Sequence, residues 1–379
     1  MVIHDGYAIS ELLAQPEFFW IADRYLDIPQ EVYPRSDAED SWYEQTLENW
    51  RERTSTNMNF ADFWEIRRAA RHVSRDNEDK TDLKFWLELL NQFTAESVSL
   101  ELRRKAIYEC VLASVMGYGS MHGLEDDLEF YMQAIDSLSS ASAIEDAAAM
   151  VTLCVGVAQQ HMAEVTVARV REWRSKLISR LENLLETEES AEERCVLLEV
   201  RGYLSLVIVG AGDDTEAADA AVTWWLKLTS EIEDAKLFPL ERFADRLTEF
   251  AILLGEHPDY SALTTAVDAL LAVRAGGFKA AEKCRDRAFR FYDARCMLRA
   301  IRELHDAKID WFATETLRAC VASMILIAEW YIECGLCYAG KHYALAAAAT
   351  SLISKNDRLR DLVPTALAIA ADGDYRAGS

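Results

Sequence analysis

Proline placement is the feature that most limits what this chain can fold into. The six prolines stand at 16, 29, 34, 239, 258 and 364, and none occurs between Arg35 and Phe238. A sheet-rich protein would need a turn about every 8–12 residues, and turns use proline and glycine. Because only 15 of the 379 residues are glycine, the sequence predicts long helices joined by short polar loops.

Apolar residues recur at helical spacing along much of the chain. Between Asp82 and Phe93 they stand at 83, 86, 87, 90 and 93, which follows one face of a helix. We predict an all-α fold, an irregular α-solenoid of antiparallel helix pairs with about sixteen helices. Expected helices include 9–26, 277–305 with a break near Arg295, 311–333, 336–353 and 358–371.

Capping boxes indicate where three of the helices begin. A serine followed three residues later by glutamate occurs at Ser41, Ser190 and Ser230. In this motif the serine oxygen accepts a hydrogen bond from a free backbone amide of the first turn, and the glutamate reaches back. The sequence therefore predicts a helix start at each of these serines.

The charge balance restricts the partners. The chain carries 40 basic and 64 acidic residues, a formal net charge of −24. Nucleic acids and anionic membranes bind through lysine and arginine, so neither is expected as a partner. A basic protein partner is compatible with this surface, although acidic charge also simply keeps a helical surface soluble.

The expected location is the cytoplasm. The first residues lack the basic and apolar regions of a signal peptide, and the most apolar stretch, Cys320–Ile332, is interrupted by Glu329. Most of the eight cysteines fall on apolar helix faces, as buried free thiols do in a reducing compartment. No cofactor is predicted.

The N-terminal region is rich in aromatic residues. Trp20, Trp42, Trp50 and Trp64 all occur within the first 65 residues. We predict an N-terminal helical cap over residues 1–75 and a helical-repeat array over 76–379, which continues into a partner or a longer parent chain. Trp42, Trp50 and Trp64 either form a docking surface or pack the cap on the first helix pairs.

The segment 325–353 resembles a tetratricopeptide helix pair. Ala328, Tyr331 and Gly335 have the spacing of a first repeat helix and its turn, and Ala339, Tyr343 and Ala347 have that of a second. A weaker echo is Gly276-Gly-Phe278 with Ala281 and Ala288. The initial Trp-x-x-Leu-Gly is absent, Leu352 stands where that family prefers proline, and no fixed 34-residue period is present. The resemblance covers about a fifth of the chain and implies an α-solenoid that binds a peptide or protein.

Two small-residue seams, Ala344–Ala349 and Ala366–Ala371, lie near the C-terminal end. A solenoid commonly ends in a polar capping helix, whereas these seams require a neighbour. We therefore expect another subunit or domain to dock at this end.

Motifs that carry chemistry are weak. Arg67 and His72 resemble the R-x4-H pattern of some helical ribonucleases, in which histidine acts as acid or base and arginine stabilises phosphorane charge. This spacing is also expected by chance, and a basic helix face of Arg67, Arg68, Arg71 and Arg75 paired with Asp62 and Glu65 explains it equally. Cys334 and Cys337 form one C-x-x-C, which favours packing over a metal site because no second pair follows, although His342 and Cys320 are near in sequence.

An acidic stretch provides the remaining candidate site. Glu188, Glu189, Glu192 and Glu193 form either a solvated helix–loop–helix corner or a docking site for a basic partner. The sequence as a whole predicts a non-catalytic interaction scaffold or adaptor. The alternatives are an acidic regulatory subunit that masks a basic effector or toxin, and a helical ribonuclease.

Overall fold

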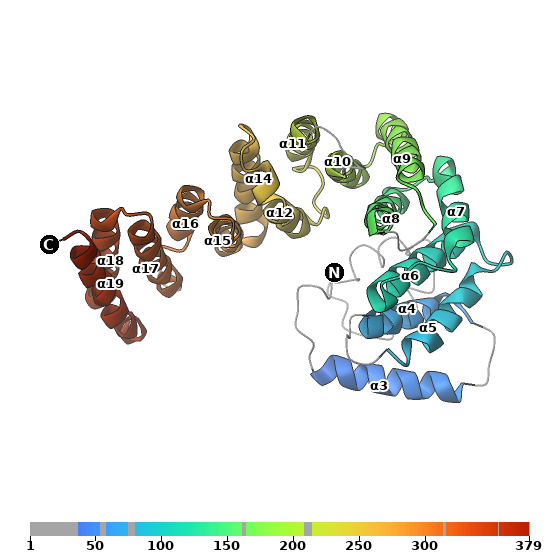
Figure 1. The fold of residues 1–379 in the computed structure, drawn as a ribbon, viewed down its shortest axis with the longest axis horizontal. Coiled ribbons are helices and arrows are strands. Elements are labelled where there is room, and N and C mark those ends of the chain that lie inside the picture. The colour runs from blue at the N-terminus through green and yellow to red at the C-terminus, as the bar shows by residue number, and fades with distance from the viewer. Residues whose placement is uncertain are drawn as a thin grey trace. The chain divides into compact units, whose positions relative to one another are not determined.

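The computed structural model describes residues 37–53, 58–74, 80–160, 164–207, 214–313, 316–354 and 356–378. Within these ranges it contains seventeen α-helices, a few 3-10 turns and no strand (Figure 1). The fold is therefore all-α, an irregular α-solenoid of antiparallel helix pairs, as predicted. The predicted helix over 9–26, with Trp20, lies outside the described residues. The chain divides into two compact units, residues 1–217 and 218–379.

Unit 1 holds eight helices. They are α3 (Asp37–Glu52), α4 (Phe60–Ser74), α5 (Leu83–Asn91), α6 (Leu100–Tyr118), α7 (Glu125–Gln133), α8 (Ala141–Gln160), α9 (Val167–Thr187) and α10 (Ala191–Leu206). Ser190 caps α10, since its side chain accepts a hydrogen bond from the Glu193 amide, which confirms that predicted start. The predicted start at Ser41 is wrong, because α3 already begins at Asp37.

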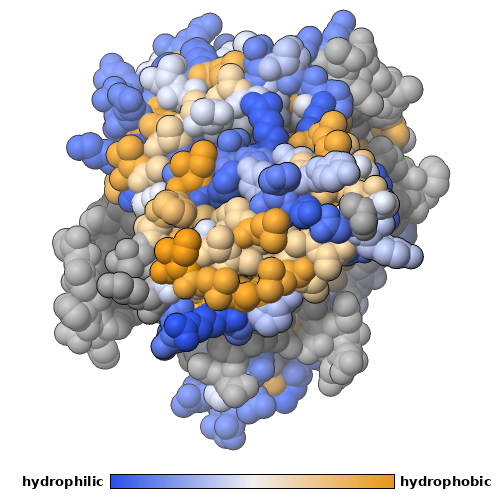
Figure 2. Space-filling view, turned by 90° about the vertical axis from the view of Figure 1, so that its left-hand side faces the viewer, coloured by the Kyte–Doolittle hydropathy of each residue, from blue (hydrophilic) through white to orange (hydrophobic). Residues whose placement is uncertain are grey.

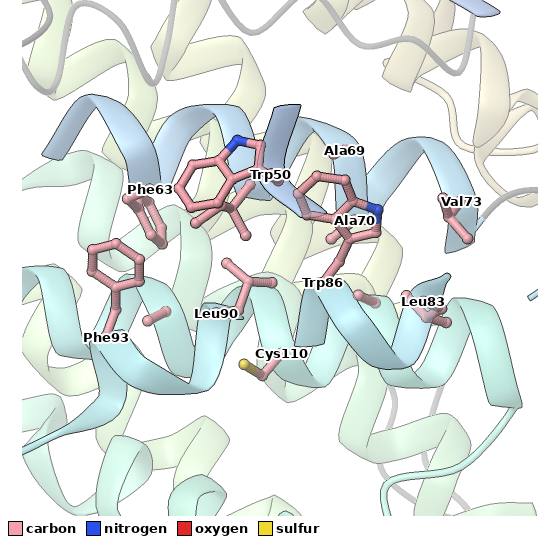
Figure 3. Packing of buried hydrophobic residues seen from close by; sticks show 13 residues of the cluster. Trp50, Phe63, Ala69, Ala70, Val73, Leu83, Trp86, Leu90, Phe93 and Cys110 are labelled. Atoms are coloured by element: carbon pink, nitrogen blue, oxygen red, sulfur yellow. The ribbon is translucent and has the colours of Figure 1, made fainter. Parts of the chain in front are cut away.

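Large aromatic side chains fill the core between α3, α4, α5 and α6 (Figure 3). Trp50 and Trp86 meet at 6.5 Å between ring centroids, and Phe63 meets Phe93 edge to face at 5.3 Å. Such pairs add to the stabilisation from burial of the rings. Val73 and Leu83 both belong to this core, so the predicted boundary after residue 75 falls inside one packed cluster.

Helix α8 is the most apolar helix of unit 1. Its window Ala141–Ala158 has a mean hydropathy of 1.5 and is long enough to cross a membrane; it is the only such helix in the described part of the chain. Half of the window is buried, and α8 packs on α9 and α10. A core helix passes the same test of length and composition.

Unit 2 continues the series of helices, with α11 starting just before the unit boundary. The bounds are α11 (Asp214–Glu231), α12 (Leu240–Glu249), α13 (Ala251–Leu254), α14 (Tyr260–Ala275), α15 (Gly277–Asp293), α16 (Met297–Asp310), α17 (Leu317–Glu333), α18 (Cys337–Ile353) and α19 (Val363–Arg376). From α14 onward each helix packs on the next one in sequence. The predicted start at Ser230 is wrong, because this serine lies in the last turn of α11 and its hydroxyl donates back to the Lys227 carbonyl at 2.6 Å.

The pairs α15–α16 and α17–α18 repeat one another at a spacing of 40 residues. Their first helices start at Gly277 and Leu317, and their second helices at Met297 and Cys337. Arg295 (φ 63°) and Gly335 (φ 78°) occupy the same left-handed position of the turn. The expected break of 277–305 near Arg295 is thus confirmed. This period differs from the 34 residues of tetratricopeptide repeats.

The seam between α17 and α18 depends on small residues. Gly340 of α18 faces α17 so closely that an added Cβ would lie 2.5 Å from Cγ1 of Ile332 and 2.6 Å from the Ala328 carbonyl oxygen. Ala344 packs with Ala328 in the same seam. Close helix approach therefore replaces the large aromatic side chains of unit 1.

A buried arginine joins three helices of unit 2. The Arg287 guanidinium on α15 binds Asp268 of α14, with Nη1 to Oδ1 at 3.1 Å, and Glu303 of α16, with Nε to Oε2 at 2.9 Å. Only 2% of the arginine side chain is exposed. Burial opposes its charge, but the two carboxylates raise the pKa of Arg287 well above its ordinary value.

Candidate interaction surface

The three tryptophans of the predicted docking surface lie around the aromatic core. Trp50 is buried, and its Nε1 donates to Oε2 of Glu65 at 2.7 Å. Trp42 and Trp64 are partly buried against the same cluster, with the guanidiniums of Arg68 and Arg67 over their rings. This arrangement supports the packing of the first helix pairs as the role of Trp50, and a docking role for Trp42 and Trp64 stays a prediction.

Arg67 and His72 occupy the interior of unit 1. Arg67 Nε donates to Oε1 of Glu109 at 2.6 Å, and Arg71 Nε donates to Oε2 of the same carboxylate at 2.8 Å. Burial alone would raise the pKa of Glu109, but the two guanidiniums hold it below its ordinary value. His72 is 5% exposed and stacks on Tyr43 at 4.5 Å.

The ion pairs around this helix differ from those expected from sequence. Asp62 was the expected partner of the α4 arginines, and it binds Arg53 with Nη1 to Oδ1 at 2.7 Å. Glu65 accepts the Trp50 indole N–H. Glu109, 42 positions from Arg67, could not be identified from spacing within one helix.

The four glutamates of the acidic corner lie between α9 and α10. Glu188 Oε1 accepts a hydrogen bond from the Ser190 amide at 2.9 Å, and Glu193 Oε2 accepts one from the Ala141 amide at the start of α8 at 3.1 Å. Both carboxylates therefore stabilise local chain ends. Glu189 is exposed and Glu192 is half-buried, and their part in docking stays a prediction.

Cys334 and Cys337 flank the turn between α17 and α18. Both thiols are half-buried and free, and burial raises the pKa of Cys334. Among the residues that the structure describes, no group of three or more histidine, cysteine, aspartate or glutamate side chains could hold a metal ion.

The two tyrosines of the tetratricopeptide resemblance meet across the α17–α18 seam. Tyr331 and Tyr343 lie 5.7 Å apart between ring centroids. Their hydroxyls lie 3.0 Å from Nε2 and Nδ1 of His305 respectively, while Lys308 Nζ donates to His305 Nδ1 at 2.7 Å. Desolvation, followed by the Lys308 charge, lowers the pKa of His305. The cluster ties α16 to the next pair.

A second surface, missed from sequence, runs over the first helices of successive pairs. We define the first-helix surface by Phe289 and Tyr292 on α15 and by Trp330, Glu329 and Glu333 on α17. Tyr292 stacks on Trp330 at 4.6 Å, and Phe289 meets Trp330 edge to face at 5.8 Å. Phe289 is 40% exposed, so these rings offer an apolar platform to solvent.

Two carboxylates border this platform. Glu329 and Glu333 stand four residues apart on α17, a like-charge spacing that destabilises a helix. The Tyr292 hydroxyl donates to Oε2 of Glu333 at 3.1 Å. Partial desolvation, with the nearby Glu333 charge, raises the pKa of Glu329. A cationic side chain placed between the two would relieve this repulsion. The sequence signal was Glu329 itself, a charge inside the apolar stretch Cys320–Ile332.

No protein-family model matches the chain. No curated protein matches it either. Among solved structures it is similar to one described as a "circular tandem repeat protein with novel repeat topology and enhanced subunit contact surfaces", at 15% sequence identity and a TM-score of 0.30, over 98% of this chain and 97% of the other. At this TM-score the similarity supports no conclusion about fold or function, which are argued from the helices alone.

Proposed function

We propose that this protein is a non-catalytic, tetratricopeptide-like scaffold that binds a segment of a partner protein on the first-helix surface. The observation that carries the proposal is the exposed Phe289 ring beside the Glu329–Glu333 pair. Such a surface fits a segment that presents a lysine or arginine next to an apolar side chain, because the ring takes the apolar part and the carboxylates take the charge. The cytoplasm is the proposed location.

The placement of Arg67 and His72 supports a non-catalytic role. A histidine that acts as acid or base must reach the substrate, whereas His72 is buried under Tyr43 and the Arg67 guanidinium is bound by Glu109. We accordingly propose neither a ribonuclease activity nor a cofactor.

An array of short peptides that vary in basic and apolar content, probed with the full chain, tests the proposal. Peptides with a basic residue beside an aromatic or aliphatic one are expected to bind best. Phe289→Ala and Glu333→Gln should each weaken that binding about tenfold, a loss of about 1.4 kcal/mol. The matched controls Phe312→Ala and Glu249→Gln, at exposed positions elsewhere in unit 2, should leave it unchanged.

Salt dependence separates this proposal from the charge-masking alternative. Binding through an aromatic platform and one ion pair should weaken only a few-fold over a tenfold rise in salt. A regulator that masks a basic effector through the whole acidic surface should lose affinity much more steeply. Array binding that ignores both substitutions and follows peptide charge alone would contradict the proposed surface.

A further inference from the structure

Helix α19 has the position of a first helix in a third pair. Gly378 follows it with φ 78°, the left-handed conformation that Gly335 adopts after α17. The Gly378 amide donates to the Tyr375 carbonyl, as the Gly335 amide does to Ile332, and the Ala377 amide donates to Gly373 as Cys334 does to Trp330. The ends of α17 and α19 are therefore equivalent at a spacing of 43 residues.

One face of the two helices is alike under this equivalence. Arg318, Glu329 and Glu333 of α17 are exposed, and of the residues 43 positions later, Asp361 and Arg376 are also exposed. Arg318 and Asp361, equivalent positions of the two helices, form an ion pair with Nη1 to Oδ1 at 2.9 Å. This polar face contacts solvent in both helices.

A second face differs. The α17 stripe is buried, with exposures from 0% to 7%, and consists of Val321, Ile325, Ala328 and Ile332. Its equivalents on α19, the α19 stripe, are exposed and consist of Pro364, Ala368, Ala371 and Tyr375, with Tyr375 at 82%. Leu367 beside them is 47% exposed.

Helix α18 covers the α17 stripe. Val321 and Ile325 pack with Ala347 and Ala348, and Ala328 packs with Ala344. Nothing in the described chain covers the α19 stripe in the same way. Figure 2 looks onto the end of unit 2 formed by α18 and α19, and shows a band of apolar atoms across it. The α19 stripe is thus the seat of a second helix.

We propose that α19 of a second copy of this chain occupies that seat, antiparallel and around a two-fold axis. Antiparallel is the direction in which α18 runs against α17. In this register Ala368 faces Ala371 of the other copy, and Pro364 faces Tyr375. Small residues at the centre allow the close approach already present at Gly340, and both stripes are covered at once.

Charge favours a second copy at this end over any other part of the surface. Two chains of −24 repel each other in general. Residues 336–378, however, contain five lysines and arginines and four aspartates, so this end is nearly neutral. In the two-fold register Arg376 lies near Asp361 of the other copy. The proposal does not depend on the first-helix surface.

Sedimentation velocity of the full chain, from about 1 to 200 µM, tests the proposal. We expect a monomer–dimer equilibrium that tightens as salt rises, because screening reduces the repulsion between two acidic chains. Ala368→Glu should weaken the dimer at least tenfold, since a charge would be buried at the centre. Val273→Glu on α14, a control at an 86% exposed apolar position, should not change it.

A charge exchange tests the register. Because Ala368 faces Ala371 of the other copy, Ala368→Glu mixed with Ala371→Lys should form a mixed dimer in which Glu and Lys meet, while each variant alone stays monomeric. Both substitutions are at exposed helix positions that tolerate glutamate and lysine, so circular dichroism should be unchanged.

Three outcomes would overturn the proposal. They are a wild-type chain that is monomeric over the whole range and at high salt, a dimer that Ala368→Glu does not weaken, and single variants that fail to combine. In the first case the seat would remain for a helix of another protein, which a peptide with the α18 sequence would detect by binding.

Discussion

The two units solve the same packing problem with opposite materials. Unit 1 places large rings between helices and surrounds one carboxylate, Glu109, with two guanidiniums. Unit 2 brings helices together over glycine and alanine and surrounds one guanidinium, Arg287, with two carboxylates. The difference shows that equivalent burial is reached either by filling space or by removing it, and that the sign of the central charge decides how each unit responds to change.

The largest expected effect is at the centre of unit 1. Glu109→Gln leaves two guanidiniums without their common anion, and Arg67 is only 4% exposed. Removal of one partner from a buried pair costs about 3–5 kcal/mol, so the urea midpoint of unit 1 should fall sharply. The control Glu88→Gln, at an exposed position on α5, should stay within about 0.5 kcal/mol. Equal midpoints for the two variants would refute the role of Glu109.

Arg287→Met should cost less, about 2–3 kcal/mol. The carboxylates that it leaves are 15% and 16% exposed, so water reaches them. Burial also raises the pKa of Glu303 in spite of Arg287. Arg290→Met, at an exposed position on the same helix, is the matched control for the lost charge.

The pH dependence of these two losses has opposite sign. A carboxyl with a raised folded-state pKa contributes stability below its ordinary value, and this is lost as pH rises. The Arg287→Met loss should therefore shrink by about 1 kcal/mol between about pH 7 and pH 5. The lowered pKa of Glu109 means that its contribution is complete above the ordinary value and is lost only as pH falls below it. The Glu109→Gln loss should stay constant over the same range, as urea titrations at each pH would show.

Gly340→Ala tests the small-residue seam. The added methyl group would meet Ile332 and the Ala328 carbonyl, and overpacking of this kind costs about 1–3 kcal/mol. The thermal midpoint should fall in proportion. A variant as stable as wild type would mean that α17 and α18 separate at no cost, which the seam does not allow.

The same substitution in unit 1 should act in the other direction. Gly156 lies inside α8 with no atom within 4 Å of an added Cβ. Gly156→Ala should therefore raise stability by about 0.5–1 kcal/mol through the helix propensity of alanine. A loss at both glycines would indicate that packing is tight in both units and would remove the contrast between them.

Local signals in the sequence predicted the helices, and long-range contacts escaped it. The proline-free stretch and the 3.6-residue periodicity depend only on neighbours in sequence, so the all-α fold and the break near Arg295 could be predicted. Ser190 was placed correctly, whereas Ser41 and Ser230 carry the same motif inside helices, because the motif does not state where helical φ and ψ begin.

Sites composed of residues from different helices could not be predicted. Arg67 and Glu109 are 42 positions apart, and Tyr292 and Glu333 are 41 apart. Only their packing partners identify them. The tetratricopeptide resemblance located the α17–α18 pair, but its period of 34 hid the spacing of 40 that the turn at Arg295 reveals.

The order of contacts in unit 2 has a consequence for how such a chain changes over generations. Each helix from α15 to α19 packs mainly on the helices next to it in sequence, so the surface that α16 offers to α17 resembles the one that α18 offers to α19. Deletion or duplication of a 40-residue segment would rejoin two matching surfaces. Relatives of this protein can therefore differ in length by whole helix pairs and still fold.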